Sequence, residues 1–176
     1  ITAAKDIYRL CDIILAEAQD ITGADGGTFY LVRQDDRGHD DHLDFVIVRN
    51  KTLGISTDIR NPKDARFPGM PLFKGEPDSH SKRKPNEQHI AAWAYHHRAL
   101  VNIADAYAED RFDFAGTRAF DQKAGYHSQS FLAVPLESDD GRIIGVFQLI
   151  NAVDPVSGAI IPFTAAMEPA ICALAV

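Results

Sequence analysis

The sequence has few of the residues that mark disulfide frameworks, zinc sites or nucleic-acid binding. It holds only 2 Cys in 176 residues, Cys11 and Cys172, and one pair so widely spaced forms neither a zinc site nor a disulfide framework. Both lie in apolar helical patterns, so we expect two buried thiols. Lys and Arg number 18 against 25 Asp and Glu. The resulting net charge of −7 argues against partners such as duplex nucleic acid or an anionic membrane surface.

Long apolar runs and nucleotide-binding loops are also lacking. No run approaches the roughly 20 apolar residues of a membrane span. The first ten residues, ITAAKDIYRL, are amphipathic rather than signal-like. These features predict a soluble, cytoplasmic protein. The chain has no Gly-rich phosphate loop and no Ser or Cys nucleophile in a recognisable setting, so we expect a domain that is not itself an enzyme.

What is present suits a single globular domain over residues 1–176, because 45% of the residues are apolar. Apolar residues recur every three or four positions from Ile7 to Ile21 and predict a helix that ends at Thr22 and Gly23. Segments rich in β-branched and aromatic residues predict strands. These predicted strands cover residues 27–33, 43–50, 130–136 and 142–151.

The predicted strands are apolar on both faces. In the last one, Ile143, Phe147 and Leu149 fall on one side, and Ile144, Val146 and Ile150 fall on the other. A sheet built of such strands must be covered on both sides. The turn ESDDGR joins the last two strands as a hairpin, and QDDRGHDDH joins the first two.

The middle of the chain is less regular in pattern. Residues 51–85 carry five of the nine Pro residues and the basic run SKRKP, and we expect this insertion to be mostly irregular and mobile. Pro85 and Asn86 then supply a helix start for NEQHIAAWAYHHR, and ALVNIADAY predicts a short strand. The loop of residues 113–130 is polar, and the carboxylates at residues 105–121 are expected to cap turns and pair with Arg111 and Arg118.

Two groups of His residues invite a metal interpretation. The run HDDH at 39–42 falls at the predicted hairpin tip, where side chains diverge, so we interpret it as a solvated turn and expect no metal site. His96 and His97 are consecutive on a helix and point about 100° apart, so they cannot share one ion. A haem ligand among His89, His96, His97 and His127 is left open.

The order of elements and several segments resemble a GAF domain, the small-molecule sensory module of many signalling proteins. The segments that carry the resemblance are VNIADAY, DRFDF, FDQKAGY, SFLAVPL and GVFQLINAVDP followed by IPF. The resemblance implies an α+β, GAF/PAS-like (profilin-like) sandwich. In such a fold a central six-stranded antiparallel sheet carries the terminal helices on one face. Short helices and lid loops cover a ligand on the other face.

The resemblance also implies a set of ligand-binding residues. These are Thr28, Arg49, Asn50, Ile90, Ala91, Tyr107, Asp121 and Gln148. Their chemistry suits an anionic ligand with an aromatic ring, such as a cyclic nucleotide or a related purine. Backbone N–H groups at the start of the NEQHIAA helix can hold a phosphate. Tyr107 and Arg49 can flank a ring, and Asn50 and Gln148 can bond a base edge.

The sequence departs from cyclic-nucleotide-binding relatives at three positions. Ala152 and Met167 stand where a Lys and an Asp pair with each other, and Ala124 stands where a Thr is common. Apolar replacement of both members of a buried ion pair can be neutral, so we expect the fold to survive. Asn151, Phe163 and Glu168 retain the rest of that signature.

Two functional hypotheses follow from the resemblance. In the first, a small-molecule sensor controls a covalently linked output domain of the phosphohydrolase, nucleotide cyclase or diguanylate-cyclase type. In the second, a ligand-free module dimerises through its terminal helices and acts as a scaffold. The chain begins at Ile and stops within the helical pattern AICALAV, so we expect a fragment of a longer signalling protein.

Overall fold

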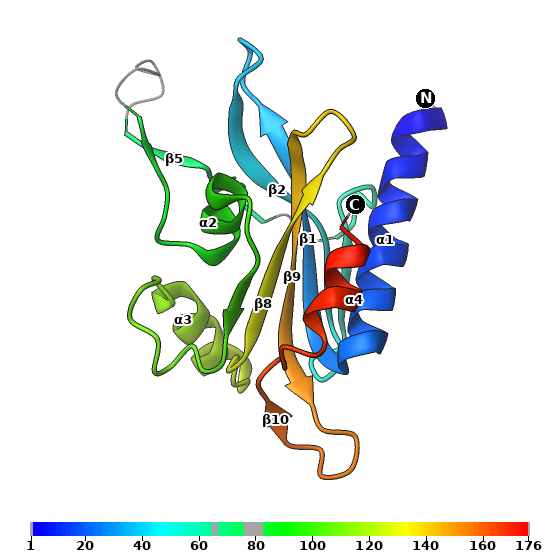
Figure 1. Cartoon of the computed structure of the whole chain (residues 1–176), viewed down its shortest axis with the longest axis vertical. Coiled ribbons are helices and arrows are strands. Elements are labelled where there is room, and N and C mark those ends of the chain that lie inside the picture. Colours follow the sequence, from blue (N-terminus) through cyan, green and yellow to red (C-terminus); the bar gives the residue numbers. More distant parts are fainter. Residues whose placement is uncertain (1, 65–66, 76–82, 176) are drawn as a thin grey trace.

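The computed structural model describes residues 2–64, 67–75 and 83–175, with side chains from residue 6 onward, and shows a sheet between two layers of helices (Figure 1). In chain order the elements are α1 (Thr2–Thr22), β1 (Ala24–Gln34), β2 (Asp40–Asn50), β3 (Ile55–Asp58), β4 (Met70–Pro71), β5 (Phe73–Lys74), β6 (Lys84–Pro85), α2 (Ile90–His97), β7 (Val101–Ile103), α3 (Ala115–Ala124), β8 (Phe131–Glu137), β9 (Ile143–Val153), β10 (Ile160–Ile161) and α4 (Glu168–Ala173). Among the described helices, none has the length and apolarity that a bilayer crossing needs.

The main sheet is antiparallel, and its hydrogen-bonded path runs β3-β2-β1-β9-β8-β7. This path is the six-stranded sheet that the sequence predicts, and the short strands β10 and β4 add to it by pairing with β9 and β2. The long strands β1 and β9 occupy its centre, where Thr28 pairs with Gln148. The α+β fold class is therefore confirmed.

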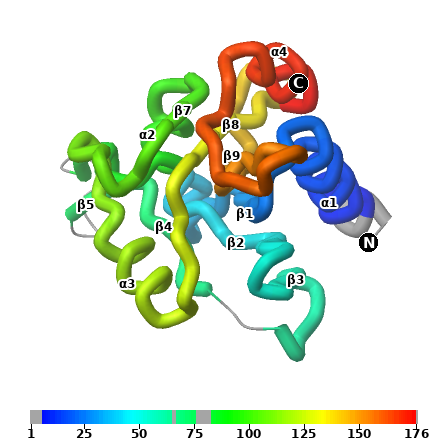
Figure 2. Tube along the Cα trace, turned by 90° about the horizontal axis from the view of Figure 1, so that it is seen from below, coloured from blue at the N-terminus to red at the C-terminus, as the bar shows by residue number. Residues whose placement is uncertain are grey.

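The terminal helices α1 and α4 cover one face of the sheet (Figures 1 and 2). Cys11, Leu15 and Ala18 of α1 are buried against that face. The approach is close at Gly27, because a Cβ there would lie 2.6 Å from Leu15 Cδ1. Part of the apolar stripe predicted for residues 7–21 therefore packs on the sheet, whereas Leu10 and Ile21, which belong to the same predicted stripe, are 51% and 43% exposed.

Helices α2 and α3 lie on the opposite face (Figure 2). A second apolar core fills the space between α2 and the sheet. Its buried members include Tyr30, Leu43, Leu72, Ile90, Ala94, Val101, Ile103, Phe131 and Val146. The prediction that both faces of the sheet must be covered is confirmed by these two separate cores.

Residues 51–85 contain more regular structure than their composition suggests. The described part of this insertion holds the four short strands β3, β4, β5 and β6, while residues 65–66 and 76–82 lie outside the described residues. The predicted helix start was wrong. Pro85 belongs to β6, the Asn86 amide donates to the Pro71 carbonyl at 2.8 Å, and the helix begins only at Ile90. Tertiary pairing of this segment with its neighbours outweighs the local capping preference.

Three further predictions need correction. Asp40, Asp41 and His42 lie within β2 rather than at the hairpin tip, so that strand begins earlier than expected. Cys172 is exposed, because α4 buries a different side against the sheet, at Ile171. The predicted loop of residues 113–130 contains the ten-residue helix α3.

Candidate functional site

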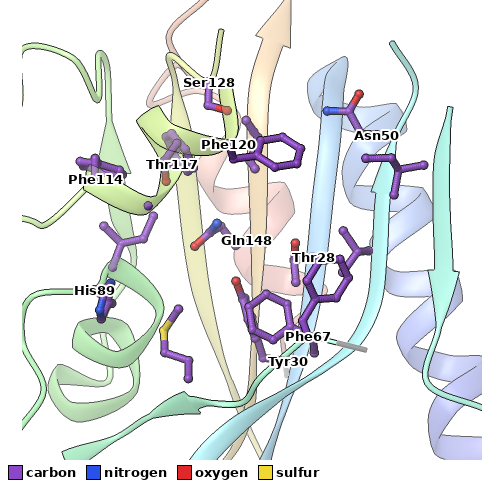
Figure 3. Close-up of a pocket in the computed structure, with 18 of the residues that line it drawn as sticks. Thr28, Tyr30, Asn50, Phe67, His89, Phe114, Thr117, Phe120, Ser128 and Gln148 are labelled. Atoms are coloured by element: carbon purple, nitrogen blue, oxygen red, sulfur yellow. The ribbon is translucent and has the colours of Figure 1, made fainter. Parts of the chain in front are cut away.

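A cavity of about 420 Å³ lies between the sheet and the helices α2 and α3 (Figure 3). Its size falls in the range of small-molecule sites, roughly 300–1,000 Å³. Strands β1, β2 and β9 form its floor, and the first turns of α2 and α3 form its opposite wall. Residues of the insertion, among them Phe67 and Met70, complete one side.

The cavity walls are largely aromatic. Tyr30 and Phe45 meet edge to face with ring centroids 4.7 Å apart, and Phe45 lies 5.3 Å from Phe67. On the helix side the ring of Phe114 lies 5.2 Å from that of Phe131, which belongs to β8, and Phe120 of α3 also lines the cavity. Such walls suit a flat apolar or aromatic ligand.

The floor carries polar side chains at its centre. Figure 3 shows Gln148 and Thr28 projecting from adjacent strands into the cavity. Gln148 is only 8% exposed as a whole residue, and its carboxamide, to which no described residue hydrogen-bonds, opens to the cavity. A buried amide with two donors and an acceptor normally finds partners inside a protein. A ligand with a polar edge would supply them.

The N-terminal ends of α2 and α3 both lie at the cavity wall. Helix α2 begins after His89, which makes no side-chain cap, and His89 and Ile90 line the cavity. In α3 the first-turn residues Gly116 and Thr117 line it, although the Ala115 N–H is already bound by the Asp113 carboxylate at 2.9 Å. The partial positive charge of helix N-termini favours an electron-rich ligand group at this wall.

His89 is the titratable imidazole of the cavity wall. Burial lowers its pKa from the ordinary value, and the Asp113 carboxylate acts in the opposite direction. The imidazole is therefore neutral at pH 7 and offers either a donor or an acceptor, according to its tautomer.

Five of the eight ligand-binding residues expected from the sequence line this cavity. They are Thr28, Arg49, Asn50, Ile90 and Gln148. The other three, Ala91, Tyr107 and Asp121, do not line it. Ala91 is fully buried in the second core, whereas the Tyr107 hydroxyl donates to Asp121 Oδ2 at 2.8 Å outside the cavity.

Arg49 does not present its charge to the cavity. It pairs with Gly27, whose Cα faces Leu15 of α1, so its side chain points to the α1 face of the sheet. There its guanidinium donates to the Asp12 carboxylate. The expectation that Arg49 flanks a ligand ring is therefore not supported by its placement.

Asp121 forms hydrogen bonds within the protein rather than lining the cavity. Its carboxylate accepts hydrogen bonds from the Ser128 N–H and hydroxyl, each at 2.7 Å, in addition to the Tyr107 hydroxyl. It thereby ties the end of α3 to the segment that leads into β8. We call α3 and residues 125–130 the lid.

The sequence prediction missed several cavity residues of the lid and the residue before it. They are Phe114, which precedes α3, and Gly116, Thr117, Phe120, Tyr126 and Ser128 of the lid. Phe114, Thr117 and Phe120 recur every three residues, which is the spacing of one helical face, and this signal could have identified them.

The described residues do not bring metal ligands together. Across residues 2–64, 67–75 and 83–175, no three His, Cys, Asp or Glu side chains could jointly hold a metal ion. His42 instead contacts Asp41 at 3.0 Å and Asp44 at 3.1 Å, and all three residues lie within β2.

Two known proteins have segments that are similar in sequence to about a third of the chain. A segment of 62 residues is 40% identical to the dual 3',5'-cyclic-AMP and -GMP phosphodiesterase 11A of Takifugu rubripes, and this match covers 35% of the chain and 6% of that protein. A segment of 54 residues is 37% identical to the dual phosphodiesterase 11 of Drosophila melanogaster, covering 31% of the chain and 3% of that protein. The chain thus corresponds to a small part of these relatives.

Solved structures match over nearly the whole chain. The GAF domain region of a putative membrane protein from Geobacter sulfurreducens has a TM-score of 0.55 at 18% identity, with 98% of this chain and 92% of that chain covered. The GAF domain of the Acinetobacter phosphoenolpyruvate-protein phosphotransferase has a TM-score of 0.53 at 16% identity, with 93% and 78% covered. The sequence profile of the GAF domain matches residues 6–175, and the chain therefore belongs to the GAF domain family.

Proposed function

We propose that the domain is a sensor that binds a planar, purine-like molecule in the cavity and controls a linked output domain. The unpartnered carboxamide of Gln148, nine-tenths buried beneath aromatic walls, carries this proposal. A base edge would satisfy its donors and its acceptor, and the rings around it would stack on the base. GAF domains are generally regulatory modules, which agrees with a sensory rather than a catalytic role.

A cyclic nucleotide is the specific ligand that we propose to test first. The identity shared with segments of two dual cyclic-nucleotide phosphodiesterases supports this choice. The helix starts at His89 and Gly116 support it as well, because backbone N–H groups there can hold a phosphate. We further propose a cytoplasmic location and an output domain of the phosphohydrolase or cyclase type.

Calorimetric titration with adenine, guanine, cyclic AMP and cyclic GMP tests the proposal. We expect at least one of them to bind, and we expect Gln148→Leu to weaken that binding about tenfold or more, because two hydrogen bonds are lost. Leu keeps the side-chain volume and removes an unsatisfied amide, so the variant should remain folded. Gln122→Leu is the matched control, since Gln122 is exposed on α3 outside the cavity.

The sensory role would be contradicted if none of the four compounds gave heat on titration and native mass spectra showed no co-purified molecule. The alternative would then be a ligand-free module that dimerises through its terminal helices. Leu10, Ile13 and Ile21 of α1 favour it, because they are 51%, 48% and 43% exposed. In that case sedimentation would show a dimer whose stability does not depend on purines.

A further inference from the structure

The hydroxyl of Tyr126 joins the cavity to the ends of β1 and β9. Its ring lines the cavity, and its hydroxyl donates to Asp25 Oδ2 at 2.7 Å and accepts from Asn151 Nδ2 at 2.9 Å. One lid residue therefore hydrogen-bonds to two strands of the sheet, β1 and β9.

Tyr126 is also fixed to α3. Helix α3 ends at Gly125, whose left-handed backbone (φ 65°) turns the chain, and the Tyr126 N–H donates to the Asp121 carbonyl at 3.1 Å. Because Thr117 and Phe120 of the same helix line the cavity, a ligand that shifts α3 must also move Tyr126. The position of Tyr126 is therefore linked to that of α3.

On the β1 side the contacts lead to α1. Asp25 Oδ1 accepts from the Thr52 hydroxyl at 2.8 Å, which holds the carboxylate in place. Gln19 of α1 is 3% exposed, and its amide donates to the carbonyls of Ala24 and Asp25, each at 3.3 Å. The last turns of α1 are therefore attached to the residue that Tyr126 holds.

On the β9 side the contacts lead towards α4. Asn151 has a left-handed backbone (φ 57°), which is uncommon for a residue other than Gly. Its side chain also accepts from the N–H groups of Gln129 and Ser130, at 2.7 and 3.2 Å. The Ser130 hydroxyl donates to the Ile161 carbonyl of β10 at 2.8 Å, and β10 precedes α4. A residue in an uncommon backbone conformation that is held by several hydrogen bonds is typical of switch regions.

We propose that Tyr126 is a positioning residue that couples the lid to α1 and to β10, the strand that precedes α4. The proposal rests on the sensory function argued above and adds its route of transmission. Movement of α3 on ligand binding changes the bonds of Tyr126 to Asp25 and Asn151. The change reaches α1 through Gln19 and reaches β10 through Ser130.

Amide hydrogen exchange of the ligand-free protein tests the coupling without any knowledge of the ligand. Tyr126→Phe keeps the ring and removes the hydroxyl. We expect faster exchange in the last turn of α1 and in residues 24–27, 50–54 and 150–153, by roughly fivefold or more, which corresponds to about 1 kcal/mol of lost local stability. A purely local role would confine the change to residues 121–130.

Tyr107→Phe is the matched control. It also removes a lid hydroxyl bonded to a carboxylate, but that carboxylate, Asp121, belongs to the lid itself. Its exchange should change only in the lid and in residues 105–108. If Tyr126→Phe behaves like Tyr107→Phe, the proposed coupling is wrong.

A second measurement adds cyclic GMP as the probe. In the wild-type protein, binding should slow exchange in the lid and at the end of α1. In Tyr126→Phe it should slow exchange in the lid alone. If cyclic GMP does not slow amide exchange in the lid of the wild-type protein, cyclic GMP is not the ligand. The comparison of the two ligand-free variants would still decide whether Tyr126 couples the lid to α1.

Discussion

Single residues in this domain take their roles from the face of the sheet on which they lie. Gln148 and Thr28 occupy paired positions that face the cavity, whereas Arg49 lies on the opposite face with Asp12. The family resemblance implied that Arg49 contacts the ligand, and its residue type agreed, because a guanidinium can stack on a ring. Strand parity excluded its guanidinium from the cavity.

The side chain of Asn151 makes four hydrogen bonds to the lid, and its backbone is left-handed. Replacement by Ala should remove four hydrogen bonds and leave two inward-facing N–H groups unpaired, at a cost of roughly 3 kcal/mol or more in the free energy of unfolding. Asn151→Gly loses the same bonds but accepts the left-handed backbone, so it should be about 1 kcal/mol more stable than the Ala variant. Urea unfolding measures both values. Equal stability of the two variants would show that the backbone at this position carries no strain.

At the scale of elements, the cavity depends on how strands and helices meet. The lid was expected to be a polar loop, but its residues 115–124 form α3 and direct Phe120 into the cavity. The position of the insertion depends on pairing: β3 extends the sheet at β2, and β4 pairs with the other end of β2. Neither pairing partner can be identified from the local composition of residues 51–85.

The ion pair of Arg49 and Asp12 attaches α1 to β2 and offers an element-scale test. Both side chains are partly exposed, 28% and 40%, so a double-mutant cycle with Arg49→Ala and Asp12→Ala should give a coupling of roughly 1 kcal/mol or less. Neither variant should weaken ligand binding more than about twofold, because the pair lies on the far face of the sheet. A loss of affinity in Arg49→Ala but not in Asp12→Ala would restore Arg49 to the ligand site.

At the scale of the whole molecule, the two faces of the sheet carry different elements. One face packs α1 and α4, whereas the other holds the cavity and the lid (Figures 1 and 2). The paired departures at Ala152 and Met167 are consistent with this arrangement. Ala152 is fully buried and Met167 packs against the same core, so apolar contacts stand at the two positions where the family resemblance implied an ion pair.

The burial of His89 should make global stability depend on pH. Its pKa is lower in the folded protein than the ordinary value of 6.5, so the unfolded chain takes up the proton first as the pH falls. Stability should therefore be fully present above about pH 6.5 and decline below it until the folded state is protonated as well. Urea unfolding of the wild-type protein and of His89→Gln, at about pH 7.5 and about pH 5.5, measures this difference. The variant should lose less stability between the two pH values, and an unchanged difference would contradict the assignment to His89.

The sequence by itself determined the main strands, the first helix and the need to cover both faces, because hydrophobic periodicity is a local property of the chain, and its family resemblance gave the α+β class. It also identified Thr28, Asn50, Ile90 and Gln148 as residues near one pocket through family resemblance. Only the tertiary structure decided which side chains converge. Ile144 packs on the α1 side rather than beside Val146, because a register shift between Leu136 and Glu137 changes the strand parity. The register and pairing of strands depend on contacts between distant segments, and no local pattern encodes such contacts. Tyr126 and Asp25, for example, are 101 residues apart in the sequence.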